Sequence, residues 1–244
     1  MRKIFCSLGL ALFVLPVLAQ DIHLNEYNYT VPDIARRGIT KERIFAGLER
    51  RFIKLGDSIC SNRALIWAFD MKRHWGVDSA KIFLFYTEKK GEVSDKAWWY
   101  HVAPLVNENG TLWVVDAGFP RFVREPLLPQ QWLKKFAASE NCKELTAGDD
   151  DLVAEIFDQR QFPSRTRHGQ YDCYYRIASA PYWTPSAIAR NFLGRNRDGS
   201  PVDFVRERIN TGELMQACME ASTTPLGGIF TNKRRKCREY LGFE

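Results

Sequence analysis

Two β-prone segments joined by Asn109-Gly110 constrain the fold of this chain more than any other part of its sequence. Residues 98–106 and 111–117 are mostly apolar, and the Asn-Gly dipeptide between them is typical of the tight turn of a β-hairpin. Apolar side chains on both faces of each segment predict strands inside a sheet rather than at its surface. We therefore expect an antiparallel hairpin that belongs to a larger sheet.

The length of the turn decides which side chains face each other across this hairpin. A two-residue loop at 109–110 places His101 opposite Gly118, with Asp116 one diagonal step away on the same face. A four-residue loop at 107–110 places His101 directly opposite Asp116, whereas a three-residue loop would put the two on opposite faces. In the first two cases the imidazole and the carboxylate lie within the roughly 4.5–8 Å over which cross-strand side chains interact.

Helices are predicted on both sides of the hairpin. One helix is expected from a Thr40 cap to Gly56, and a second, largely apolar helix from residue 57 or 58 to Trp75. Residues 81–87 predict a strand that precedes the hairpin. After Asp116, further helices are expected near residues 129–138, 150–159, 185–193 and 203–221.

The first nineteen residues have the pattern of a secretory signal peptide. Arg2 and Lys3 precede an apolar run over residues 4–18, and Ala19 suits the last position before a cleavage site. The run is shorter than the roughly 20 apolar residues that span a bilayer, so no stable membrane anchor is expected. The predicted location is secreted or periplasmic, and loss of Arg2 and Lys3 lowers the formal net charge from +6 to +4.

The cysteines divide into one that is lost, four that pair and one that is left over. Removal of Cys6 with the signal peptide leaves five of the six cysteines, and structural cysteines pair in an oxidising compartment. Cys60 precedes the next cysteine by 82 positions and is the expected unpaired one. The favoured pairing of the others is Cys142 with Cys173 and Cys218 with Cys237, while the two other pairings of these four stay open.

Three residues form a set suited to thiol catalysis. Cys60 falls in the first turn of the predicted second helix, where the positive end of the helix dipole favours a thiolate. His101 and Asp116 then supply a base and a carboxylate that can orient it. A lone His or Asp in a strand is more often structural, so the hypothesis depends on the three residues occurring together.

Around these residues the chain resembles the bacterial protein-glutaminases, which deamidate glutamine side chains in proteins. The resemblance implies that Cys60 is the nucleophile, His101 the base and Asp116 the residue that orients the base. It also implies an α+β fold with a papain/transglutaminase-like core, in which a helix bearing Cys packs on an antiparallel sheet bearing His and Asp. The matching segments are Cys60-Ser61-Asn62-Arg63-Ala64 and residues 76–83, 97–103 and 114–116.

The resemblance implies a hydrolase of carboxamide C–N bonds that converts protein-bound glutamine to glutamate through a Cys60 thioester, and the signal-peptide pattern predicts that it is secreted. Its partners would be proteins or peptides with exposed glutamine, and an inhibitor or immunity protein is a further candidate partner. A cysteine protease or transglutaminase on the same triad and a non-catalytic secreted binding protein stay open as alternatives. Candidates for the oxyanion site or the cleft walls are Ser61, Trp98, Trp99 and Tyr100.

No cofactor, metal or nucleic acid is expected to bind. Residues 149–151 lack the further oxygen ligands of a calcium loop, and the histidines lack zinc-site spacing. The basic run at 233–236 predicts a solvated tail or a docking patch for acidic proteins, because the mature net charge is modest.

The expected organisation is a signal peptide at 1–19, an extended lead at 20–39 and a single catalytic domain at 40–244. The core of this domain is expected at 40–120, and a disulfide-braced, helical C-terminal part at 121–244.

Overall fold

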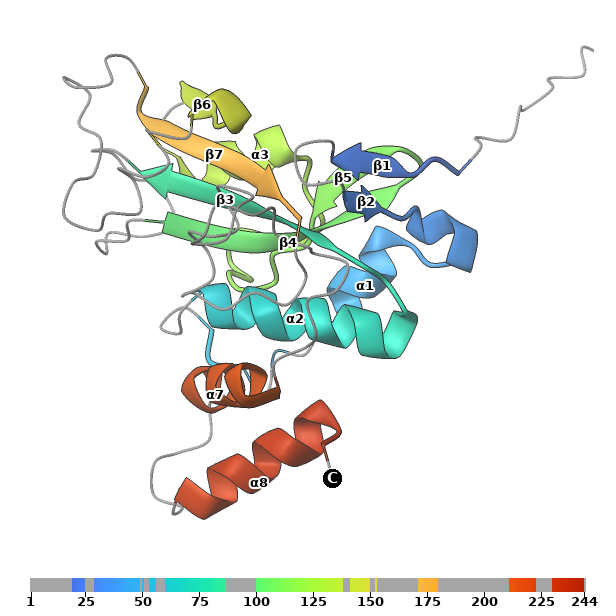
Figure 1. The fold of residues 1–244 in the computed structure, drawn as a ribbon, viewed down its shortest axis with the longest axis vertical. Helices are drawn as coiled ribbons and strands as arrows, with labels where there is room; N and C mark the ends of the chain where they lie inside the picture. Colours follow the sequence, from blue (N-terminus) through green and yellow to red (C-terminus); the bar gives the residue numbers. More distant parts are fainter. Residues whose placement is uncertain are drawn as a thin grey trace, which may run out of the picture.

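A five-stranded sheet forms the centre of the computed structural model (Figure 1). The strand order is β5-β4-β3-β7-β6, and the two short strands β1 and β2 form a separate sheet. The structure describes residues 19–24, 29–48, 50, 53–55, 60–86, 100–137, 141–149, 152, 171–179, 211–222 and 230–243. The strands are β1 (Ile22–Leu24), β2 (Tyr29–Val31), β3 (Ala80–Tyr86), β4 (Tyr100–Glu108), β5 (Thr111–Val114), β6 (Cys142–Glu144) and β7 (Cys173–Ala178), and the helices are η2 (Ile34–Arg37), α1 (Lys41–Gly47), α2 (Cys60–Trp75), α3 (Pro129–Phe136), η3 (Ala147–Asp149), α7 (Thr211–Ala221) and α8 (Phe230–Leu241).

The β4–β5 hairpin has the two-residue loop that the Asn-Gly signal predicts. Leu105 pairs with Val114, and the loop residues Asn109 and Gly110 have positive φ angles of 53° and 75°. Both positive angles are those of a type I′ turn, which matches the right-handed twist of the flanking strands. Since β5 ends at Val114, Asp116 lies where the chain leaves the sheet, on the face of the hairpin predicted from this register.

The sheet is mixed, so the prediction of an antiparallel sheet was wrong at one edge. β7 pairs antiparallel with β3, but β6 runs parallel to β7. The long segment between β6 and β7 allows a parallel crossover, which a tight turn would not. The part after residue 120 therefore supplies two strands as well as helices, although only helices were predicted there.

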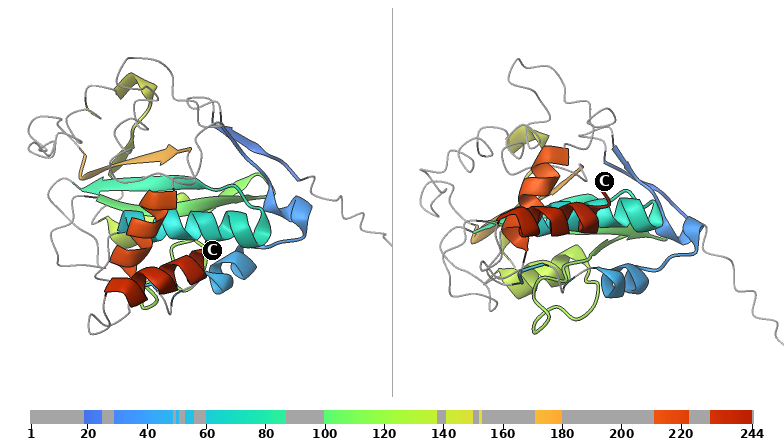
Figure 2. Two further views of the ribbon diagram at one scale, coloured as in Figure 1. Left: turned by 60° about the horizontal axis from the view of Figure 1, so that its bottom comes forward. Right: turned by 90° about the horizontal axis from the view of Figure 1, so that it is seen from below.

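Helix α2 is the buried central helix that its apolar sequence predicts. All of its residues from Ser61 to Met71 are buried, and it packs between β4 and α7, with α8 packed against α7 (Figures 1 and 2). Gly76 follows the helix with a left-handed φ of 64°, a conformation that suits glycine at a helix end. The predicted start of this helix at residue 57 or 58 lies outside the described residues.

Helix α1 is shorter than predicted. Thr40 caps it by accepting a hydrogen bond from the backbone N–H of Arg43 at 3.2 Å, as expected. The helix ends at Gly47 instead of continuing to Gly56, because the buried Leu48 adopts an extended backbone conformation. Further on, Ile53 forms a β-bridge with Ser222, so tertiary pairing replaces the helix there.

The helices after the hairpin agree with the prediction in part. Helix α3 lies within the range expected near 129–138, and α7 forms the end of the range expected at 203–221. The basic run at 233–236 lies in α8 rather than in a tail. The helices expected near 150–159 and 185–193 fall outside the described residues, except for the single residue Leu152.

The N-terminal lead is fastened to the hairpin by one buried carboxylate. Asp33 accepts hydrogen bonds from the backbone N–H groups of Gln20 at 2.7 Å, Ala35 at 2.9 Å and Asn109 at 3.0 Å. These bonds tie the start of the described chain to the turn that sets the hairpin register. The predicted signal peptide lies outside the described residues except for Ala19, and none of the described helices has the length and apolar character of a membrane span.

Alternating side chains of the sheet enter two different clusters. Ile82 and Leu84 of β3 belong to the main core, which also includes buried residues of α1, α2, α3, α7 and α8. Phe83 and Phe85 point to the opposite face and form a smaller cluster with Tyr174 of β7. His101 pairs with Leu84 and so lies on the face of the main core.

Candidate active site

Cys60 begins the described part of α2 and lies against the start of β4. Its thiol contacts the carbonyl oxygen of Tyr100 at 3.9 Å and receives a hydrogen bond from the backbone N–H of Val102. It also interacts with the imidazole of His101. The helix and the strand thus bring together two site residues that are 41 positions apart in the sequence.

His101 and Asp116 form a buried hydrogen-bonded pair. Nε2 of His101 lies 2.8 Å from Oδ2 of Asp116, and the two residues are 0% and 1% exposed. Because a carboxylate only accepts hydrogen bonds, Nε2 is the protonated ring nitrogen, and Nδ1 is the one that can face Cys60. The backbone N–H of Gly118 also donates to Oδ1 of Asp116 at 3.1 Å, which fixes the carboxylate from its other side.

Three aromatic rings surround the imidazole of His101. The Phe136 ring lies 4.5 Å away, and the rings of Phe119 and Trp132 each lie 5.3 Å away, measured between centroids. Trp132 also donates from its indole Nε1 to Oδ2 of Asp116 at 3.0 Å. These rings exclude water from the His101–Asp116 pair and restrict rotation of the imidazole.

Arg63 places a buried positive charge beside the pair. Its side chain lies one helical turn after Cys60, is 2% exposed and stacks over the Phe119 ring at 5.4 Å. The guanidinium also lies against Gly118, where an added Cβ would be 3.0 Å from Nε of Arg63. The site therefore contains a permanent cation in addition to a histidine that can become charged.

The ionisation of the three predicted site residues is coupled. Burial alone would raise the pKa of the Cys60 thiol, but His101, Arg63 and the Val102 N–H lower it below its ordinary value. Burial alone would lower the pKa of His101, but Asp116 and Cys60 raise it. Burial opposes ionisation of Asp116 as well, yet His101, Trp132 and Arg63 lower its pKa. The arrangement thus favours a thiolate–imidazolium pair supported by an ionised carboxylate.

Ser61 and Tyr100, two of the residues predicted for the cleft walls, lie beside Cys60. The Tyr100 hydroxyl donates to Oγ of Ser61 at 3.1 Å. Burial, together with the charge of Cys60, raises the pKa of Tyr100, so its phenol stays protonated and can remain a hydrogen-bond donor. The other two cleft candidates, Trp98 and Trp99, lie outside the described residues.

The structure contains both disulfides of the favoured pairing and leaves Cys60 as a free thiol. One bond links Cys142 to Cys173 across the parallel β6–β7 pair, and the other links Cys218 of α7 to Cys237 of α8. Both bonds join elements of the part after residue 120.

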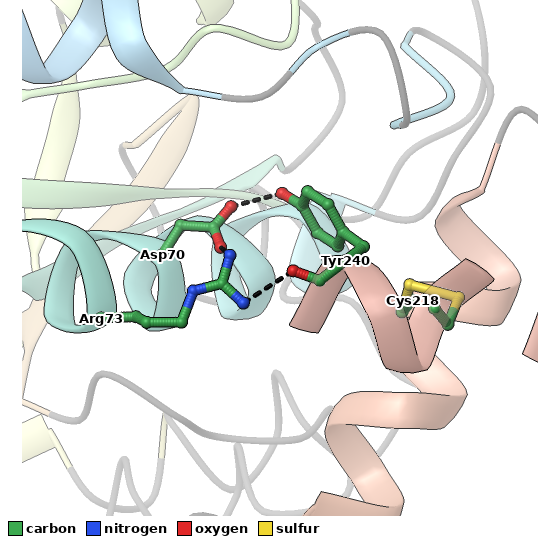
Figure 3. The surroundings of a disulfide bond; sticks show 5 residues. Asp70, Arg73, Cys218 and Tyr240 are labelled. Atoms are coloured by element: carbon green, nitrogen blue, oxygen red, sulfur yellow. Dashed lines mark hydrogen bonds and ion pairs between the residues drawn. A yellow bond between two sulfur atoms is a disulfide. The ribbon is translucent and has the colours of Figure 1, made fainter. Parts of the chain in front are cut away.

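The second disulfide joins α7 and α8, and α8 also contacts α2 through Tyr240 (Figure 3). Arg73 of α2 donates to the backbone carbonyl of Tyr240 in α8 at 2.6 Å, and the Tyr240 hydroxyl donates to the Asp70 carboxylate. Nearer the site, Nδ2 of Asn62 donates to Oε2 of Glu220 in α7 at 2.7 Å. The helix that carries Cys60 is thus held by polar contacts along its length.

The described residues contain no group of three or more His, Cys, Asp or Glu side chains that could hold a metal ion. Asp149, the described member of the acidic run at 149–151, instead contacts Lys143 and accepts a hydrogen bond from the backbone N–H of Thr146 at 2.9 Å.

Sequence reasoning assigned no role to Arg63 or Trp132. Arg63 stood inside the Cys60-Ser61-Asn62-Arg63-Ala64 segment, and its spacing of three residues from Cys60 on a helix was the available signal. Trp132 and Phe136 are four residues apart in the predicted third helix and therefore share one face of it. Neither signal identifies the residue that the side chain would contact.

The fold and the site define an α+β protein with a Cys-His-Asp arrangement at the junction of a buried helix and a mixed sheet. Residues 39–136 match the sequence profile of a family described as glutaminase. The segment contains Cys60, His101 and Asp116, so the predicted resemblance is confirmed where the site lies.

One solved structure is similar to this chain. The NMR structure of protein-glutaminase from Chryseobacterium proteolyticum shares 16% sequence identity with it, with a TM-score of 0.36, over 82% of this chain and 96% of that chain. No curated protein sequence matches the chain.

Proposed function

We propose that the chain is an exported protein-glutamine deamidase with Cys60, His101 and Asp116 as its catalytic residues. The observation that carries this proposal is the buried His101–Asp116 hydrogen bond of 2.8 Å beside a free thiol, inside the segment that matches the glutaminase family. A Cys-bearing helix packed on a strand that bears His also supports a papain/transglutaminase-like core.

The first half of the proposed reaction forms a thioester. The Cys60 thiolate attacks the carbonyl carbon of the glutamine side chain, and a C–S bond forms as the carbonyl oxygen takes up negative charge. The C–N bond then breaks, and the leaving nitrogen takes a proton from the His101 imidazolium to depart as ammonia. Asp116 keeps the imidazole in the orientation and tautomer that this transfer needs.

The second half hydrolyses the thioester. Neutral His101 takes a proton from a water molecule, whose oxygen attacks the thioester carbon. The C–S bond breaks, Cys60 leaves as the thiolate, and the new carboxylic acid gives its proton to solvent, so that the product leaves as glutamate. The His101 proton restores the imidazolium, so the site returns to its starting state without a cofactor.

The developing negative charge on the substrate oxygen needs hydrogen-bond donors close to Cys60. We assign this role to backbone N–H groups of the first turn of α2, where the helix dipole adds positive potential. Ser61 and Tyr100 form one wall of the proposed cleft, and their mutual hydrogen bond holds them beside the thiol. Trp98 and Trp99 are proposed as further cleft residues because they precede Tyr100 directly in the sequence.

Export is proposed from the predicted signal peptide at 1–19 and is supported by the two disulfides. Cys142–Cys173 and Cys218–Cys237 are the kind of bonds that persist in oxidising compartments. The proposed substrates are therefore proteins or peptides that the chain meets after it leaves the cytoplasm.

A peptide that contains a single glutamine tests the proposal, with the same peptide carrying asparagine in its place as control. We expect ammonia release and a gain of about 1 Da with an intact backbone, because an amide nitrogen is replaced by oxygen through the acyl-enzyme. New peptide termini would instead indicate a cysteine protease, and incorporation of an added amine a transglutaminase. A Cys60→Ala variant with full activity would exclude the proposed nucleophile.

Alkylation distinguishes the enzyme from a binding protein with a structural Cys60. Iodoacetamide reacts with the thiolate, so we expect Cys60 to react faster at neutral pH than a thiol of ordinary pKa. If the native protein reacts no faster than a buried thiol, and no glutamine peptide is converted, the non-catalytic alternative is correct.

A further inference from the structure

We propose that Arg63 is a positioning residue of the site, whose guanidinium holds the Cys60 thiolate and the Asp116 carboxylate in place. The inference extends the proposed function, because it assigns a role to a residue outside the Cys-His-Asp set. It rests on the proposed function only for its effect on turnover. Its effect on the reactivity of Cys60 is independent of which substrate the protein uses.

The burial of Arg63 is the first observation that supports this role. The residue is 2% exposed, although a buried guanidinium is costly unless negative charge or hydrogen-bond acceptors compensate it. Arg63 follows Cys60 by three positions, and side chains three residues apart on a helix lie on neighbouring parts of one face. Its position on α2 therefore directs the cation to the end of the helix where Cys60 lies.

The guanidinium of Arg63 and the carboxylate of Asp116 both lie close to Gly118. A Cβ added at Gly118 would lie 3.0 Å from Nε and 3.2 Å from Nη2 of Arg63, and also 3.2 Å from Oδ1 of Asp116. Nitrogen atoms of the cation and an oxygen of the carboxylate thus approach the same point, which only a residue without a side chain leaves open. The backbone N–H of Gly118 also donates a hydrogen bond to Oδ1 of Asp116 at 3.1 Å.

The guanidinium of Arg63 lies over the ring of Phe119. This ring lies 5.4 Å from Cζ of Arg63 and 5.3 Å from the imidazole centroid of His101, so one aromatic side chain contacts both cationic groups of the site. A lysine could supply the charge at this position but not the planar group that packs on the ring. We therefore expect loss of the positive charge at position 63 and loss of the planar guanidinium shape to have different effects.

The positive charge of Arg63 complements that of His101 during the reaction. Arg63 lowers the pKa of both the Cys60 thiol and Asp116, as His101 also does. His101 loses its proton when ammonia departs, whereas an arginine stays protonated at every working pH. Arg63 therefore keeps Asp116 ionised, and favours departure of the Cys60 thiolate, at the stage when His101 is neutral.

The test measures the pH dependence of Cys60 alkylation by iodoacetamide in the full exported chain with both disulfides intact. We expect Arg63→Met to move the midpoint upward by roughly 1 pH unit or more, and to lower kcat about 10- to 100-fold with a smaller change in KM, because a stabilising charge is lost. Arg63→Lys should restore most of the midpoint but only part of kcat. Lys72→Met, which removes a partly exposed cation near the other end of α2, should leave both unchanged.

Gly118→Ala provides a second route if Arg63→Met does not fold, as judged by circular dichroism. The added methyl group displaces Arg63 and Asp116 without removing either charge, so we expect a raised alkylation midpoint in this variant too. An unchanged alkylation midpoint in a folded Arg63→Met variant would overturn the proposal. If that variant does not fold, an unchanged midpoint together with full kcat in both Gly118→Ala and Arg63→Lys would overturn it. A shifted midpoint in a protein that deamidates no substrate would instead refute the proposed function and leave this inference intact.

Discussion

The indole Nε1 of Trp132 donates a hydrogen bond of 3.0 Å to Oδ2 of Asp116. The same oxygen lies 2.8 Å from Nε2 of His101, and the Trp132 ring is nearly parallel to the imidazole, at 21°. Helix α3 thus holds the His101–Asp116 pair from outside the hairpin that carries it. One side chain fixes the carboxylate through its N–H group and the imidazole through its ring.

Replacing Trp132 by phenylalanine separates these two contributions. Trp132→Phe keeps an aromatic ring beside His101 but removes the N–H donor, so Oδ2 of Asp116 loses one of its partners. We expect kcat to fall about 10- to 100-fold, which corresponds to the roughly 1.5–3 kcal/mol of one hydrogen bond to a charged acceptor. Steady-state kinetics measures this, with Trp113→Phe on β5 as the matched control. Equal activity of Trp132→Phe and the native protein would contradict the prediction.

Asp116→Asn tests the orientation of the imidazole directly. An asparagine amide can donate to Nε2 of His101 and thereby stabilise the tautomer with its proton on the nitrogen that faces Cys60. We expect kcat to fall by roughly 10²- to 10⁴-fold while KM changes little, because geometry is kept but the proton is misplaced. Alkylation of Cys60 should also slow at neutral pH. A variant with both kcat and alkylation unchanged would show that Asp116 is only structural.

The pH profile of activity should be broad. The pKa of Cys60 is lowered from its ordinary value of 9.0 and that of His101 is raised from its ordinary value of 6.5, so both shifts increase the population of the thiolate–imidazolium pair near neutral pH. We expect kcat/KM to fall in acid as the thiolate is protonated and in alkali as the imidazolium loses its proton. The acidic and the alkaline limb of the pH profile each reflect the Cys60–His101 pair rather than one residue. A Cys60 alkylation rate that rises only near pH 9 would contradict this expectation.

Stability should depend on pH through the same groups, with opposite signs. The lowered pKa of Asp116 gives a contribution that is present above its ordinary value of 3.8 and is lost as pH falls through the folded value. The raised pKa of His101 gives a contribution that is present below 6.5 and is lost as pH rises through its folded value. Thermal unfolding of the native protein and Asp116→Asn across this range measures the first effect, which should be absent in the variant.

The hairpin and the relation of His101 to Asp116 were predictable because their determinants are local. Asn109-Gly110 adopts two positive φ angles, and this turn type sets the register and hence the shared face. The excess of one cysteine similarly pointed to Cys60 as a free thiol. Each of these predictions depends on residues close in sequence or on a count.

The remaining parts of the site depend on packing between distant segments. Trp132 reaches Asp116 only because α3 lies beside β5, and no periodicity in the helix states which carboxylate its indole meets. The β6 strand has only three residues and pairs with a segment about thirty positions later, so its parallel direction leaves no local pattern. Helix α1 ends early for the same kind of reason, since Ile53 pairs with Ser222 from the far end of the chain.

The disulfide between α7 and α8 should stabilise the helix that carries Cys60. Cys218 lies two positions before Glu220, whose carboxylate accepts a hydrogen bond from Asn62 near the start of α2. We expect the double variant Cys218→Ser/Cys237→Ser to lose roughly 3 kcal/mol of unfolding free energy, the value typical of a loop of this length. It should also lose part of its kcat at temperatures well below its Tm, because α7 then holds Asn62 less firmly.

Denaturant unfolding and steady-state kinetics of the double variant test both effects, and Glu220→Gln isolates the contact to Asn62. Glu220→Gln keeps the shape of the side chain but removes its charge, so we expect a loss of about 1 kcal/mol or less and a small fall in kcat. Cys142→Ser/Cys173→Ser is the matched control, since that bond joins β6 to β7 at the far edge of the sheet from β5. It should lower stability while leaving the kcat of the folded fraction close to that of the native protein. If both double variants lower kcat equally, the support of α2 by α7 has no specific effect on the site.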